Sequence, residues 1–464
     1  MNKLCYLLLL SFVSAHAQPA RPATEIFARR RAEFLRQLDP HSIAILACKP
    51  EYIRNGDVEY DYRQESNFYY LTGFEEPGSI LLLRPQGAPY TYTLYVRSGN
   101  PVLETFQGHS SGVTEARMVF GADTAIPFAD FPRSLTAFSG SGGTLYYSFG
   151  VNPTVDEWIR SALLEGAGAP WTIRDPFPLL GEMRVVKNDD DWAAGFREAI
   201  RISSAAHLEA IRAIRPGMHE YEIQALFESC YRRSGSPRNG YPCIIGSGPN
   251  SCILHYNRNT RKMEGGDMVL MDCGAEFGYY TADITRTVPV NGTFTSRQRE
   301  IYQLVLDAQN AALRVVKPGL SRNAPDSIMN DVIAEGLLRK GFIKAKKDAA
   351  LFTLHGFSHW LGLDVHDVGK TIVNGHPRPL IPGMVFTLEP GIYITPRILE
   401  KLGDLGYSPE ERDRLGKALR PYMNTGVRIE DDILVTEAGC ENLTGAVPRD
   451  IDALESLMHH RAVH

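Results

Sequence analysis

GDMVLMDCGAEFGYYTADITRT, residues 266–287, predicts one strand, a glycine-containing turn and a second strand. The apolar run after the first residues is typical of a buried strand, and it places Asp272 at the strand end. Asp283 then returns on the partner strand. We therefore expect one pair of carboxylates to lie side by side where these two strands meet.

The same pattern occurs a second time in the chain. GMVFTLEPG at 383–391 is similar to GDMVLMDCG at 266–274, and the alignment places Glu389 opposite Asp272. AIRAIRPGM at 210–218 is repeated, in the same order, by ALRVVKPGL at 312–320. One such match can arise by chance, but two in one order indicate two similar α/β halves. Halves that face each other would bring together one pair of acids from each.

Five residues become candidate metal ligands in this arrangement. Taken alone, each acid after a strand is more commonly a solvated or capping residue. An acid placed against an apolar run, however, is costly to bury without a cation or counter-ion. Four carboxylates and one imidazole form an oxygen-rich set that suits two divalent cations such as Mn²⁺, Co²⁺ or Zn²⁺. The expected ligands are Asp272, Asp283, His359, Glu389 and Glu430.

Length and composition predict a globular protein with two domains. The 464 residues are too many for one ordinary hydrophobic core. A hydrophobic content of 44% with 22% charged residues is typical of soluble proteins. The formal charge of −5 is mild and no basic stripe is present, which argues against nucleic acid or an anionic membrane as a partner.

The N-terminus resembles a secretory signal. MNKLCYLLLLSFVSAHA carries one lysine, a short apolar run and the small residues Ala15 and Ala17 at a cleavage position. We expect removal of residues 1–17 and export to the periplasm or the extracellular space. A retained transmembrane anchor is the weaker interpretation, because about a dozen apolar residues are too few to span a bilayer.

The remaining six cysteines do not suggest a disulfide framework. They are scattered through apolar segments, where a buried free thiol is common. A bridge between Cys243 and Cys252 stays open as an alternative.

The order of local patterns divides the chain. A helix is expected from about Glu25 to Leu38, followed by the strand-like runs SIAILAC, FYYLTGF, SILLLRP, TYTLYVR and TLYYSFG. This predicts an N-terminal α/β domain over 18–180. Asn188 and Asp189 are then the N-cap candidates for a long helix that opens a second domain over 181–448. Residues 449–464 are expected to form a tail with a frayed end.

Several motifs resemble those of the pita-bread metallopeptidases of family M24B, and within it the aminopeptidases P, with prolidase as their nearest relative. YDYRQESNFYYLTGFEEPGS at 60–79 is similar to the N-terminal domain of that family. The resemblance covers most of the mature chain, and it implies a pita-bread catalytic domain with a pseudo-twofold internal repeat. The motifs that match in order are CILHYN, DCGAEFGYYTADITRT, HGFSHWLGLDVHD, TLEPGIYI and GVRIEDD.

The resemblance also implies roles for the candidate ligands. Asp272 would chelate one cation, Asp283 and Glu430 would bridge, and His359 and Glu389 would complete the second position. A hydroxide bridging the two cations would attack the scissile carbonyl. Glu389 would carry the proton to the leaving amine. A proline leaving group needs this proton, because its tertiary amide nitrogen has no hydrogen.

Further side chains would line the substrate site by the same resemblance. His255 and His366 would donate hydrogen bonds to the carbonyl oxygen or its tetrahedral successor, and His355 would shape the proline pocket. An isolated histidine is otherwise more commonly a core residue. Arg428 would orient Glu430, receive the chain beyond proline, or only balance charge. Two aromatic residues match pocket positions and fit an ordinary core equally well: Tyr241 and Tyr393.

The implied activity is that of an exported Xaa-Pro aminopeptidase acting on peptides with proline at the second position. We expect two divalent cations, first of all Mn²⁺, and a homodimer or homotetramer. An Xaa-Pro dipeptidase, a metal-free peptide-binding relative and metal-free hydrolysis remain alternatives. The five ligands disfavour the last two.

The chain departs from the aminopeptidase P pattern in two places. Forty residues separate Glu389 from Glu430, which puts the accepted substrate length in doubt. Phe106 and His109 stand where the pattern has Trp and Arg, so we expect recognition by the N-terminal domain to differ.

Overall fold

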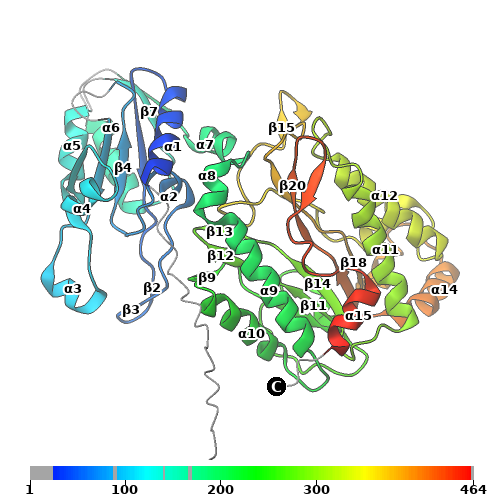
Figure 1. Ribbon diagram of the computed structural model, residues 1–464. Coiled ribbons are helices and arrows are strands. Elements are labelled where there is room, and N and C mark those ends of the chain that lie inside the picture. Colours follow the sequence, from blue (N-terminus) through cyan, green and yellow to red (C-terminus); the bar gives the residue numbers. More distant parts are fainter. Residues whose placement is uncertain (1–23, 87–90, 139–141, 166–169, 461–464) are drawn as a thin grey trace, which may run out of the picture.

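The chain forms two lobes in a computed structural model, which describes residues 24–86, 91–138, 142–165 and 170–460 (Figure 1). The N-terminal lobe is joined to the larger C-terminal lobe through helices α7 (Phe177–Arg184) and α8 (Asp189–Asp191). The predicted signal at residues 1–17 lies outside the described residues.

A six-stranded sheet with the order β6-β5-β4-β1-β7-β8 forms the centre of the N-terminal lobe. Alternate residues of β1 contact different layers: Ile43 and Ile45 pack with α5 and α6, whereas Ala44 and Leu46 pack with α1, α2 and α4. Helix α1, Thr24–Gln37, confirms the predicted opening helix. The other elements are β1 (Ser42–Ala47), β4 (Ile80–Leu83), β5 (Tyr92–Val96), β6 (Thr124–Pro127), β7 (Gly143–Tyr146), β8 (Trp171–Arg174), α4 (Gly112–Met118), α5 (Phe131–Phe138) and α6 (Pro153–Glu165).

One predicted strand of this lobe is wrong. FYYLTGF belongs to helix α2, Ser66–Thr72, in which every residue is buried. A helix buried on all sides has no amphipathic period, so its aromatic residues resemble a strand in the sequence. The cap residues give the better signal, because Glu65 accepts a hydrogen bond from the Phe68 amide and Gly73 adopts φ +66°.

The C-terminal lobe contains the predicted repeat of helix pairs and strand pairs. Helices α9 and α10 pack together, as do α11 and α12. Strand β11 pairs antiparallel with β14, and β17 pairs antiparallel with β20. The two halves meet where Thr285 pairs with Glu430. The bounds are α9 (Arg197–Ala213), α10 (Glu220–Arg233), α11 (Ser296–Leu313), α12 (Ala324–Arg339), β11 (Met268–Asp272), β14 (Thr285–Pro289), β17 (Val385–Leu388) and β20 (Asp431–Val435).

The long helix expected from Asn188 is interrupted. Of the two N-cap candidates, Asn188 caps α8, but Trp192–Phe196 forms a wider turn before α9 begins. Gly195 has φ +133° there, and a Cβ atom would lie 2.7 Å from the Phe277 ring. Only glycine accommodates both constraints.

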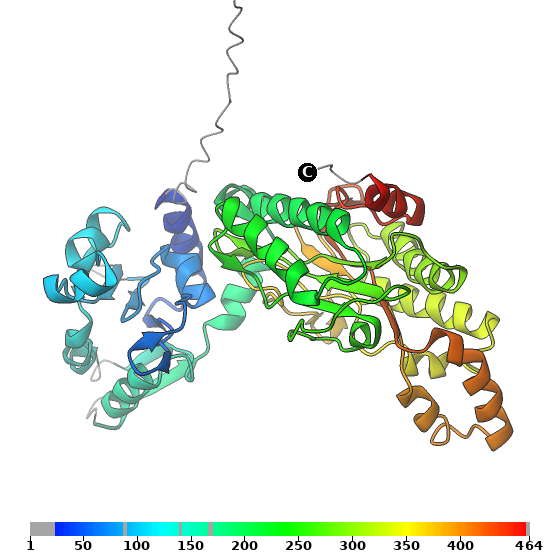
Figure 2. The ribbon, with the colours of Figure 1, turned by 90° about the horizontal axis from the view of Figure 1, so that it is seen from below.

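The middle of the forty residues between Glu389 and Glu430 forms helices at the end of the lobe that faces away from the N-terminal lobe (Figure 2). Helix α13 is Arg397–Lys401 and α14 is Pro409–Leu419. They are held by Tyr407, whose hydroxyl donates to Asp348 at 2.6 Å.

The described part of the C-terminal tail differs from the expected frayed end, and residues 461–464 lie outside the described residues. Residues Ile451–His459 form helix α15, in which Leu454 and Met458 are buried against the main core. Within the described residues, no helix combines the length and apolar character needed to cross a membrane. All six described cysteines are free, so the Cys243–Cys252 bridge is absent from this part of the chain.

The remaining elements are short. They are β2 (Ile53–Asn55), β3 (Val58–Glu59), α3 (Pro101–Gln107), β9 (Arg238–Asn239), β10 (Ile244–Ser247), β12 (Ala275–Phe277), β13 (Tyr280–Thr281), β15 (Ile372–Val373), β16 (His376–Pro377), β18 (Gly391–Ile394), β19 (Thr425–Arg428) and β21 (Cys440–Asn442), with short turns of helix at Phe128–Asp130, Gly248–Cys252, Lys346–Leu351 and Arg420–Tyr422.

Candidate metal centre and substrate cleft

The four predicted acidic ligands come to one place from the two halves of the repeat. Asp272 ends β11 and Asp283 lies between β13 and β14. Glu389 follows β17 directly, and Glu430 lies between β19 and β20. All four are between 2% and 9% exposed. They line one cavity of about 340 Å³, together with His359.

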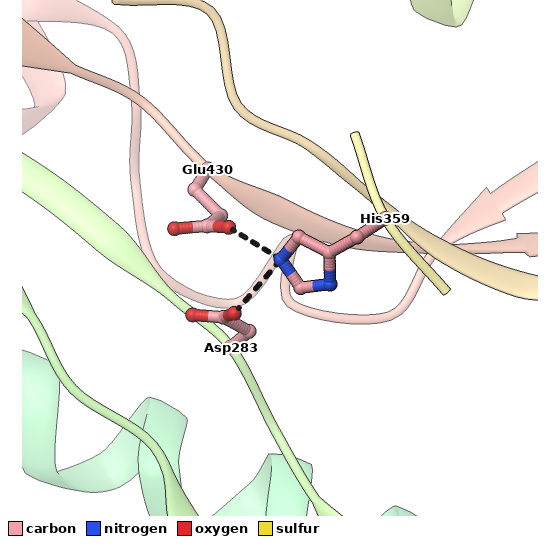
Figure 3. Close-up of side chains that lie close together, drawn as sticks. All are labelled: Asp283, His359 and Glu430. Carbon is pink, nitrogen blue, oxygen red and sulfur yellow. Dashed lines mark ion pairs between the residues drawn. The ribbon is translucent and has the colours of Figure 1, made fainter. Parts of the chain in front are cut away.

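His359 is the centre of the set. Its Nε2 atom lies 3.1 Å from Glu389 Oε1, 3.4 Å from Asp283 Oδ2 and 3.9 Å from Glu430 Oε1. One ligand atom from each of Asp283, His359 and Glu430 lies within 4.8 Å of the others, which is close enough for a shared cation. Figure 3 shows both carboxylates directed at the ring nitrogen.

The electrostatics of the cavity favour added positive charge. Burial, aided by the charge of Asp272, raises the pKa of Asp283 to about 6. Burial and the charge of Asp283 raise the pKa of Glu430 well above its ordinary value. Burial also acts on Glu389, but His359 outweighs it and lowers that pKa to about 2. The cluster stays negative even with His359 protonated, so the donor set fits divalent cations.

Arg428 orients Asp272 rather than Glu430. Its Nη2 donates to Asp272 Oδ2 at 2.5 Å, whereas its Nε lies 3.9 Å from Glu430 Oε2. Its Nη1 donates to the Tyr393 hydroxyl at 2.9 Å, and that oxygen lies 2.7 Å from His355 Nε2. Arg428 therefore links a candidate ligand to a histidine of the cleft.

Tyr241 contacts the candidate ligands instead of only lining a pocket. Its hydroxyl oxygen lies 2.6 Å from Asp272 Oδ1 and 2.6 Å from Asp283 Oδ1. The hydroxyl has a single proton to donate, so one of these two contacts is not a hydrogen bond from it. The two carboxylates are thus held close to one oxygen atom, and a cation bound between them would offset their negative charge.

Three supporting residues were missed in the sequence. Thr285 donates to Glu430 Oε2 at 2.6 Å, Thr387 donates to Glu389 Oε1 at 3.0 Å, and Asp432 accepts from the Asp283 amide at 3.2 Å. Thr387 lies two positions from its partner along an extended segment, a spacing that places both side chains on one face. The sequence TLEPG shows that spacing, so the contact of Thr387 could have been predicted. The contacts of Thr285 and Asp432 join the two halves of the repeat, and no local pattern indicates them.

The three other predicted histidines, His255, His355 and His366, line the same cavity. The His355 side chain is mostly buried, at 17% exposed. His255 and His366 are exposed, in contrast to the carboxylates below them. The His366 ring lies 4.3 Å from the His359 ring, measured between centroids. Buried acids on the floor and accessible imidazoles at the rim form a cleft that can receive a polar backbone.

The two segments that depart from the aminopeptidase P pattern are not part of the cavity lining. No residue of the segment 395–424 is among the described residues that line it. The helices of this segment therefore lie outside the cavity lining. Phe106 lies in α3 with 81% of its surface exposed, and His109 pairs with Glu115 at 2.8 Å.

Comparisons with known proteins match both lobes. Residues 194–437 match the model of metallopeptidase family M24, and residues 27–146 match the aminopeptidase P N-terminal domain. The chain is 37% identical to the Xaa-Pro aminopeptidase of Escherichia coli, over 93% of this chain and 97% of that protein. It is 33% identical to the human Xaa-Pro dipeptidase, over 86% and 84% of the two chains.

A solved structure shows the same similarity in three dimensions. The structure of Pseudomonas aeruginosa aminopeptidase PepP superposes with a TM-score of 0.86 at 38% identity, covering 95% of this chain and 98% of that one. The likeness extends over both lobes.

Proposed function

The chain belongs to metallopeptidase family M24 and carries the aminopeptidase P N-terminal domain, and from this premise we propose that it is an Xaa-Pro aminopeptidase. Its reaction would be hydrolysis of the bond between an N-terminal residue and a following proline. The observation that carries the proposal is the buried set of four carboxylates and His359 beneath three histidines in one cavity.

We propose that two divalent cations, first of all Mn²⁺, are held by Asp272, Asp283, His359, Glu389 and Glu430. When bound, such cations polarise the scissile carbonyl and lower the pKa of a water molecule. The excess of buried negative charge supports this assignment, because four acids with one guanidinium and one imidazole are otherwise undercompensated.

The side chains of this protein would then bind and orient the peptide. His255 and His366 are accessible at the rim and would donate to the substrate carbonyl oxygen. His355, held by the Tyr393 hydroxyl, would form one wall beside the proline ring. Glu389 lies between His359 and His355 in the cavity, and it would accept a proton and pass it to the proline nitrogen.

The dipeptidase alternative is decided by substrate length. We expect cleavage of Ala-Pro-Ala-Ala to alanine and Pro-Ala-Ala, with no cleavage of Ala-Ala-Ala-Ala. Hydrolysis of both peptides and of free Ala-Pro is followed by mass spectrometry, and a Glu389→Gln preparation made in parallel controls for host peptidases. Cleavage of Ala-Pro alone would overturn the aminopeptidase assignment and favour the dipeptidase.

We further propose that residues 1–17 are removed on export, which the pattern of those residues supports. Assembly as a homodimer or homotetramer is proposed from the family resemblance.

A further inference from the structure

His366 is an exposed histidine of the cleft. Its ring contacts the His359 ring, with the centroids 4.3 Å apart, but among the described residues it makes no hydrogen bond to the protein. Its position is therefore set by the loop 360–369 that carries it. This loop holds a charged residue on each side of the histidine, Asp364 and Asp367.

Asp367 is fixed from outside the loop by two basic side chains. Its carboxylate is fully buried, with Lys187 Nζ donating at 2.8 Å and the Arg184 guanidinium pairing with its other oxygen. The side chains of Arg184 and Lys187 are each 2% exposed. A buried pair of this kind is costly to break, since removal of one partner leaves an uncompensated charge.

Asp364 is fixed by the N-terminal lobe. The Ser66 hydroxyl donates to its Oδ1 at 2.7 Å, and Arg184 Nη2 donates to its Oδ2 at 2.8 Å. Burial would raise the pKa of Asp364, but the charge of Arg184 outweighs it and lowers that pKa. Arg63 donates to the Leu363 carbonyl at 2.6 Å and so holds the backbone next to Asp364.

Close packing leaves the loop little freedom on this side. A Cβ atom on Gly362 would lie 2.0 Å from Asp367 Oδ2 and 2.7 Å from Lys187 Nζ. Gly369, at φ +138°, would place a Cβ atom 2.7 Å from Val185 Cγ2. The loop therefore rests directly on the segment that joins the lobes.

We propose that Arg184 and Lys187 are positioning residues that hold His366 in place, and that Ser66 and Arg63 connect this support to the N-terminal lobe. Arg184 and Lys187 lie between the two regions that match family models, 27–146 and 194–437. The N-terminal lobe thus supports the loop that carries His366. This inference rests on the proposed function.

A double-mutant cycle tests the inference. Arg184→Gln and the milder Ser66→Ala are each made alone and in combination with His366→Ala. Arg29→Gln is the matched control, because Arg29 also pairs across the lobes, with Asp190 at 3.0 Å, but does not contact the loop. For every variant, kcat and KM are measured on Ala-Pro-Ala-Ala, with metal content and Tm as checks.

We expect Arg184→Gln to lower kcat up to about 10²-fold, the scale that a misplacement of about 1 Å can cause. Ser66→Ala should lower kcat in the same direction by a smaller factor, and Arg29→Gln should leave it unchanged. In the His366→Ala background the further losses should vanish, because the positioned group is gone.

Equal fold-losses with and without His366 would show a merely structural role and overturn the inference. Should Arg184→Gln fail to fold, Ser66→Ala carries the same comparison, and an unchanged kcat in that variant would also overturn it. Failure of the wild-type protein to cleave Xaa-Pro peptides would instead contradict the proposed function.

Discussion

Replacing Glu389 by glutamine is expected to lower kcat for Xaa-Pro cleavage about 10³-fold or more. Glu389 Oε1 lies 3.1 Å from His359 Nε2, and its Oε2 lies 3.4 Å from His355 Nδ1. The amide keeps the size of the side chain and one donor oxygen, but it cannot accept and return a proton. The loss should therefore fall on kcat more than on KM.

Steady-state kinetics on Ala-Pro-Ala-Ala measure this loss, with bound metal determined in the same samples. Glu441→Gln is the control for the chemical change, because its side chain is 47% exposed and is not part of the cavity lining. A Glu389→Gln enzyme that keeps kcat within about threefold at full metal content would contradict the proton-transfer role.

Replacing Asp283 by asparagine is expected to abolish hydrolysis while stabilising the metal-free protein. The folded-state pKa of Asp283 is about 6, above its ordinary value of 3.8, because burial and Asp272 oppose its charge. Above pH 6 the folded protein therefore bears the cost of a buried charge that the unfolded chain does not. Removing that charge should raise the free energy of unfolding by about 1–3 kcal/mol at pH 7.5.

The pH dependence gives the sign of this effect. The proton is bound more tightly in the folded state, so metal-free wild-type protein should gain stability as pH falls from 7.5 through about 6. The advantage of Asp283→Asn should shrink over the same interval. Thermal unfolding in chelator at several pH values measures both trends, with Asp452→Asn, 95% exposed, as control. A Tm of Asp283→Asn below that of wild type at pH 7.5 would contradict the account.

Residues whose neighbours are close in sequence were the ones that could be predicted. The strands that carry Asp272 and Glu389 follow from their apolar runs, and the repeated phrases indicated that the two would meet. The resemblance of the motifs added His255, His355 and His366, which line the same cavity. Helix α2 was misassigned because all its residues are buried. Uniform burial removes the alternation of apolar and polar residues that identifies an amphipathic helix.

Contacts between distant segments could not be predicted in the same way. Arg428 was expected beside Glu430 because two positions on a strand share a face, yet it bonds Asp272 from the other half. The support of Asp364 by Ser66 joins residues that are far apart in the chain. Such pairings depend on how the lobes pack, which no local pattern specifies.

Titration with Mn²⁺ of protein from which a chelator has removed the metal tests the central claim most directly. Bound metal and the rate of Ala-Pro-Ala-Ala cleavage are measured on the same samples. The account predicts no cleavage in the metal-free protein and a rate that rises to its plateau as two cations bind per chain. Full activity without metal, or no cation retained after Mn²⁺ loading, would contradict it.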